Sequence, residues 1–108
     1  MPESEVFRIT KAEHYPQPFN PLKNNRLYID FAVSQGCKKI KFGLYTAGYR
    51  RILEREIAAN IAAGNHRAFV EAAEIRNLSN GTYYWVIEAA GEKGGNASSA
   101  ANAMIVLR

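Results

Sequence analysis

The most reactive side chains in this sequence are its single cysteine, Cys37, and its two histidines, His14 and His66. A catalytic thiolate needs a neighbouring base and an electropositive environment, and neither histidine stands in a motif that would supply the base. One cysteine also excludes an internal disulfide and a thiolate metal cluster. A zinc site built on two histidines would need several carboxylates, and none have the required spacing. We therefore expect no catalytic residue, no cofactor and no metal site.

Basic residues are a second candidate for chemistry, because the chain carries a net charge of +4 and positive charge attracts anionic surfaces. Glu54 and Glu56 are mixed into the same region and weaken its field. The favoured interpretation is a solvated strand face on which lysines oppose aggregation, and the alternative is binding of an anionic polymer. Nucleic acid is not an expected partner. We call the two clusters of excess charge the basic patch; its residues are Lys38, Lys39 and Lys41, then Arg50, Arg51 and Arg55.

Aromatic residues offer a third kind of site, a platform on which sugar rings could stack. Its members would be Tyr28, Tyr83, Tyr84 and Trp85. Trp85 lies in the middle of an alternating segment, where core packing is the favoured interpretation.

The strands that must position these residues can be read from apolar residues that recur at every second position. Apolar and polar residues alternate over 27–33, 39–44 and 83–88, as in half-buried strands. Further strands are expected over 6–12, 66–70 and 103–107, and residues 34–37 are expected to form a hairpin loop with Gly36 at positive φ. In a chain of 108 residues that is 47% apolar, this pattern predicts one all-β domain, an antiparallel sandwich of about seven strands. No apolar run reaches the roughly 18 residues that a membrane span requires.

One segment departs from this pattern. Residues 52–63 are rich in Ala, Glu, Arg and Leu, which favour a helix, and Gly64 stands where a helix would end. Local propensity therefore favours one short helix here, although pairing in a sheet would override it.

The segment Tyr15-Pro-Gln-Pro-Phe-Asn-Pro21 is the most specific local signal. The prolines, Pro16, Pro18 and Pro21, restrict their own φ and favour extended backbone in the residues before them. We expect Tyr15 and Phe19 to be anchors against one end of the core, and Asn20 to bond its own backbone in a turn. A proline-rich ligand for a partner's aromatic groove is the functional alternative.

This segment resembles the opening signature of the immunoglobulin-like domain of flagellar hook-capping proteins, a domain type that recurs at the C-termini of exported bacterial proteins. The likeness continues in order from Tyr15 to the end of the chain. Gln17 and Thr46 depart from the pattern of the family. The remaining matches are residues 29–33, residues 41–45 with the turn glycine Gly48, an Ala-Gly-x-His turn holding Gly64 and His66, a strand start holding Gly81, Tyr83 and Tyr84, and a closing strand over 104–108.

The stretch 78–84 is also similar to the fibronectin type III turn that carries a tyrosine corner, in which a tyrosine hydroxyl bonds backbone a few residues upstream. The resemblance places Tyr84 in that role. Alternation instead puts Tyr83 on the apolar face together with Trp85. Both assignments are structural, and the sequence leaves the choice open.

The resemblance implies a non-catalytic C-terminal accessory module of an exported bacterial protein, for assembly, sorting or attachment at the cell surface. Its partner would be a protein or a passenger domain in the same chain. The first ten residues lack the basic and apolar regions of a signal peptide, so this expectation requires an excised domain. Residues 1–14 would then be a junction or first strand, and 15–108 the sandwich. If Met1 is the native start, a cytoplasmic location is expected instead.

The rival class is a ligand-binding module, for glycans through exposed aromatics or for an anionic polymer through the basic patch. A five-stranded barrel of the OB type would also fit the length and charge. Assembly by strand addition at an exposed sheet edge is a third interpretation.

Overall fold

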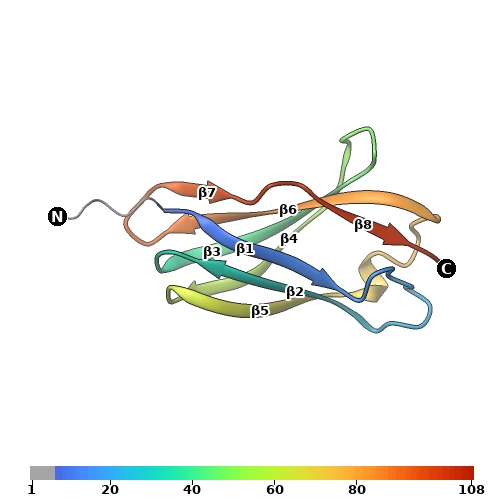
Figure 1. The fold of residues 1–108 in the computed structure, drawn as a ribbon, viewed down its shortest axis with the longest axis horizontal. Coiled ribbons are helices and arrows are strands. Elements are labelled where there is room, and N and C mark those ends of the chain that lie inside the picture. The colour runs from blue at the N-terminus through green and yellow to red at the C-terminus, as the bar shows by residue number, and fades with distance from the viewer. Residues whose placement is uncertain (1–6) are drawn as a thin grey trace.

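The chain folds into two antiparallel β-sheets packed face to face, seen in a computed structural model that describes residues 7–108 (Figure 1). A single turn of 3₁₀ helix, η1 (Ala72–Glu74), lies between β5 and β6. The strands are β1 (Ile9–Tyr15), β2 (Arg26–Val33), β3 (Cys37–Tyr45), β4 (Arg51–Ile61), β5 (Gly64–Glu71), β6 (Gly81–Gly91), β7 (Asn96–Ser98) and β8 (Asn102–Val106).

The order of the strands is that of an immunoglobulin or fibronectin-III-like sandwich. One sheet has the order β1-β2-β5, and the other has the order β4-β3-β6 with both β7 and β8 paired to β6. The expected all-β sandwich is therefore confirmed. The described residues hold eight strands rather than about seven, because the last strand is divided into two short pieces that pair with different parts of β6.

The core lies between the sheets and follows from the alternation in the strands. On β2 the residues Leu27, Ile29 and Phe31 point inward, and on β6 the residues Tyr83, Trp85 and Ile87 do so. Phe19 and Met104 close one end of this interior. Such burial of apolar surface is the main source of stability in a domain without disulfides.

The short helix expected over 52–63 is wrong, because this segment forms β4 at the edge of the five-stranded sheet. Leu53, Ile57 and Ile61 pack against the core while pairing of β4 with β3 satisfies the backbone. A register shift opposite Ile40 makes Ile57 an extra residue in β4. This β-bulge breaks strict alternation and leaves apolar residues four apart, a spacing that imitates a helix.

The hairpin loop expected at 34–37 is also wrong. Strand β2 belongs to the three-stranded sheet and β3 to the five-stranded one, so residues 34–36 carry the chain from one sheet to the other. Gly36 does not have a positive φ. Among the described residues the opening strand begins at Ile9, and Val6, where it was expected to begin, lies outside them.

In residues 7–108, no helix has the length and apolar character needed to cross a membrane.

Candidate functional site

Cys37 begins β3 and is fully buried, with its thiol donating to the carbonyl oxygen of Gln35 at 3.3 Å. Burial raises the pKa of the Cys37 thiol, and the carboxylate of Glu92 raises it further. The thiol therefore stays protonated at neutral pH, which is the opposite of what a nucleophile requires.

Both histidines are engaged in bonds that hold the sandwich together. The indole Nε1–H of Trp85 donates to Nδ1 of His14 at 2.9 Å, and Nε2 of His14 lies 3.2 Å from Oε1 of Gln17. An indole can only donate, so Nδ1 accepts and Nε2 carries the proton. His66 donates from Nε2 to the carbonyl oxygen of Ala62 at 2.6 Å, which fixes the crossover from β4 to β5. Within the described part of the chain, no group of three or more His, Cys, Asp or Glu residues could hold a metal ion.

The proline segment joins the two sheets. Phe19 is fully buried, its N–H donates to Ile105 at 2.7 Å, and its carbonyl accepts from Leu107 at 3.0 Å. Asn20 accepts the N–H of Leu22 at 2.9 Å, the turn that its side chain was expected to make. Pro16, Pro18 and Pro21 lie around these contacts, and Pro21 is buried.

Tyr15 does not anchor the core. It ends β1 on the outer face of the three-stranded sheet, where its ring stacks on Tyr28 at a centroid distance of 5.3 Å. Phe69 on β5 meets the other side of Tyr28, and Arg67 lies over Tyr15 while it bonds Asp30. These rings face one another across strands, so the row supports the sheet rather than offering a flat outward surface.

The other residues of the family resemblance occupy turns and strand starts. Gly64 and Gly81 have φ of 121° and 153°. Gly48 lies in the β3–β4 turn, but the positive φ of that turn falls on Tyr49. Tyr83, and not Tyr84, forms the tyrosine corner, since its hydroxyl donates to the carbonyl oxygen of Ser79 at 2.8 Å.

Trp85 packs in the core, as the favoured interpretation predicts, and the alternative of an aromatic platform is not assembled. Tyr83 and Trp85 are buried between the sheets. Tyr28 and Tyr84 remain partly exposed but belong to different sheets.

The structure divides the basic patch into two parts. Arg55 pairs with Glu74 of η1, which ties the β4 edge to the opposite sheet, and Arg51 pairs with Glu54 at 3.4 Å. Arg50 lies in the β3–β4 turn, where its backbone N–H donates to Oγ1 of Thr46 at 3.1 Å. The arginines are thus dispersed among structural contacts.

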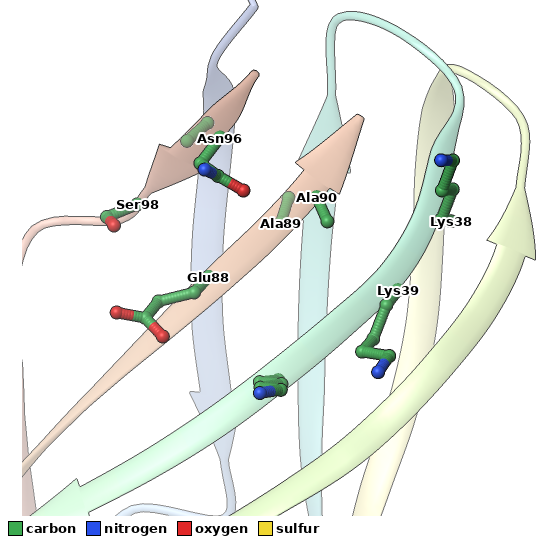
Figure 2. A pocket seen from close by; sticks show the side chains of 9 residues that line it. Lys38, Lys39, Glu88, Ala89, Ala90, Asn96 and Ser98 are labelled. Atoms are coloured by element: carbon green, nitrogen blue, oxygen red, sulfur yellow. The ribbon is translucent and has the colours of Figure 1, made fainter. Parts of the chain in front are cut away.

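The three lysines of the patch instead border a trough of about 570 Å³ on the outer face of the five-stranded sheet. Figure 2 shows Lys38 and Lys39 on β3, Glu88 and Ala90 on β6, and Asn96 and Ser98 on β7. In register, Lys39 and Asn96 both oppose Ala90, and Lys41 and Ser98 both oppose Glu88. Because its side chain is small, Ala90 forms the bottom of the trough, with lysines along one side and polar side chains along the other.

The local backbone explains why the lysines gather here. Between Cys37 and Lys39 the register against β6 shifts, so Lys38 is an extra residue in β3. This bulge leaves both Lys38 and Lys39 exposed next to each other. Lys39 forms an ion pair with Glu56 at 3.7 Å, whereas Lys38 and Lys41 form none with any other described residue.

Electrostatically, three ammonium groups line the trough and a single carboxylate, Glu88, lies among them. The arrangement can bind an anionic group and still accept a hydrogen bond from a hydroxyl of the same ligand. Sequence reasoning found the lysines but not Glu88, Asn96 and Ser98, because a three-residue strand such as β7 gives no periodic signal.

A scan of the chain against protein-family models finds no match, and a search of curated proteins finds no similar sequence.

Proposed function

We propose that this chain is a non-catalytic accessory module of an exported bacterial protein, serving assembly, sorting or attachment at the cell surface. The absence of catalysis is inferred from the reactive side chains, each of which is buried or already hydrogen-bonded within the fold. Cys37 is buried with a raised pKa, His14 accepts a bond from Trp85, and His66 donates one to Ala62.

Support for an accessory role comes from where the residues of the family resemblance lie. Phe19, Gly64, Gly81 and Tyr83 hold ends and turns of the sandwich, so they specify a fold rather than a reaction centre. A compact sandwich without disulfides can be appended to many passenger proteins. The export role is carried over from the resemblance to the hook-capping domain, since the sandwich fold itself serves many functions.

A reporter fusion tests the export role. A secreted reporter carrying this domain at its C-terminus is expected on the surface of the source bacterium, and the same reporter without the domain is expected in the periplasm. A fusion that stays in the periplasm, although soluble and protease-resistant, would refute sorting and attachment.

The lysine trough supports a second function, binding of an anionic polymer. Its lining holds an excess of positive charge, and two of its lysines lack ion pairs with other described residues. Retention of the whole chain on a dextran sulfate column should fall as salt rises, because salt screens the attraction between the lysines and the sulfate groups.

The test variant and its control each lose two lysines, so the two proteins have the same net charge. The double variant Lys39→Gln/Lys41→Gln should elute at lower salt, whereas Lys11→Gln/Lys23→Gln, on β1 and the β1–β2 loop, should elute like the wild type. Equal shifts for both pairs would mean that net charge alone causes retention and that the trough is not the site.

A further inference from the structure

Beside the lysine trough, the same outer sheet face carries three tyrosine rings, of which Tyr49 is exposed and Tyr45 and Tyr84 are partly buried. Tyr84 on β6 lies opposite Tyr45 at the end of β3. Tyr49, from the β3–β4 turn, stacks on Tyr84 with a centroid distance of 5.7 Å and an interplanar angle of 22°. Tyr49 is 69% exposed, so much of its ring is presented to solvent.

The backbone holds Tyr49 in a conformation that its side chain does not favour. Its φ is 66°, a region that glycine or asparagine enters far more easily than a bulky residue. Thr46 fixes the turn, since its carbonyl accepts from the N–H of Tyr49 at 2.8 Å and its own N–H donates to Arg50 at 2.9 Å. Gly48 is adjacent but does not take the positive φ. Strain at a residue with an exposed ring is typical of functional positions.

The tyrosines and the trough lie along the same strand, with the buried Gly43 between them. Along β3 the outward positions run Tyr45, Gly43, Lys41 and Lys39. Gly43 has no side chain, and the ring of Tyr45 occupies that space, with Cε1 3.2 Å from where a Cβ of residue 43 would lie. From Tyr45 to Lys39 the strand covers about 20 Å, which is long enough for several consecutive sugar rings.

The side chains along this strip suit a ligand with both ring faces and acidic groups. Tyrosine rings provide flat apolar surfaces for the C–H faces of sugars, and the lysines provide charge for carboxylates. Glu88, Asn96 and Ser98 can accept hydrogen bonds from hydroxyls. Glu88 lies among the lysines and can accept hydrogen bonds from hydroxyls, which a sugar chain offers on every ring and a DNA phosphodiester backbone lacks.

We propose that the outer face of the five-stranded sheet binds an acidic polysaccharide, with the exposed face of the Tyr49 ring, backed by Tyr84, stacking a sugar ring and the trough lysines binding the carboxylates. This inference deepens the second function proposed above by naming its ligand class, and it does not depend on export. Charge complementarity with the trough selects an acidic over a neutral polysaccharide.

The test is affinity electrophoresis of the whole chain through gels containing alginate, a polymer of uronic acids, with neutral dextran and poly-dT as comparisons. Retardation is expected with alginate and not with dextran, and poly-dT should bind more weakly. Neutral dextran retarding the chain as strongly as alginate, or poly-dT binding at least as tightly, would overturn the ligand class.

Tyr49→Asn is the critical variant, because asparagine tolerates the positive φ while the ring is removed. Its alginate affinity should be about threefold to tenfold lower at unchanged melting temperature, the range that corresponds to one aromatic contact. Phe69→Ala is the control, since Phe69 is an exposed ring on the opposite sheet, and its alginate affinity should equal that of the wild type.

The two proposals fail in different ways. The polysaccharide proposal would be overturned, and the anion-binding trough kept, if Tyr49→Asn bound alginate like the wild type while Lys39→Gln/Lys41→Gln still eluted from dextran sulfate at lower salt. Absence of binding to both alginate and dextran sulfate would overturn both.

Discussion

The hydrogen bond between Trp85 and His14 crosses the core and joins β6 of one sheet to β1 of the other. Trp85 is fully buried and its ring meets that of His14 edge to face at 5.7 Å. Replacing His14 with alanine leaves a buried indole N–H without its acceptor, which costs about 1–3 kcal/mol. The lost ring contact adds about 0.5–1 kcal/mol. We therefore expect His14→Ala to lower the free energy of unfolding by about 1.5–4 kcal/mol, or the melting temperature by roughly 5–30 °C.

Urea unfolding measures this change directly, because Trp85 is the only tryptophan in the chain and reports on its own surroundings. A double-mutant cycle with Trp85→Phe, followed by circular dichroism, isolates the pairwise term. Once the indole is gone, His14→Ala should cost clearly less than in the wild type. Lys11→Ala, an exposed change on the same strand, is the control and should stay within about 0.5 kcal/mol of the wild type. A change of that small size for His14→Ala, or full additivity in the cycle, would refute the reasoning.

Three further outcomes follow from single groups. Cys37 should react slowly with iodoacetamide below pH 9 and rapidly after unfolding. Because the pKa of the thiol is raised in the folded state, its contribution to stability is present below the unfolded pKa and is lost as pH rises through the folded pKa. A urea midpoint that rises with pH in this range would contradict the raised pKa. Tyr83→Phe removes the bond to Ser79 and should lower the free energy of unfolding by about 0.5–1.5 kcal/mol, whereas no change in the urea midpoint would deny the tyrosine corner. Gly64→Ala meets no atom but has a φ of 121°, so it should destabilise by about 1 kcal/mol or more through backbone strain alone, and a melting temperature at or above that of the wild type would count against this.

The sandwich could be predicted from the sequence because most strands alternate cleanly. Segments such as Leu27–Phe31 and Tyr83–Ile87 have one fully buried face and one partly exposed face, and that pattern depends only on neighbouring residues. The β4 strand could not be predicted, since its bulge at Ile57 arises from pairing with β3 and erases the alternation. The energy of pairing between strands depends on residues that are distant in the sequence, so a short stretch of sequence does not reveal it.

The candidate site was only half predictable for a similar reason. The lysines form an obvious cluster in the sequence, but Asn96 and Ser98 reach the trough only because β7 pairs with β6. The role of Tyr49 depends on a positive φ that a sequence would assign to Gly48. Tyr15 was expected inward, but in β1 it follows the inward-facing His14 and therefore lies on the outer face.

The contact between the proline segment and β8 determines how the domain would bear a mechanical load. Phe19 and Val106 form a parallel bridge, and Phe19 bonds both Ile105 and Leu107. Gln17 adds a bond from its Oε1 to the N–H of Ile105 at 3.1 Å. A force that pulls the start of β1 and the end of β8 apart stretches these parallel bonds together, in shear, rather than opening them one at a time. The domain should therefore resist extension along the line that joins the start of β1 to the end of β8.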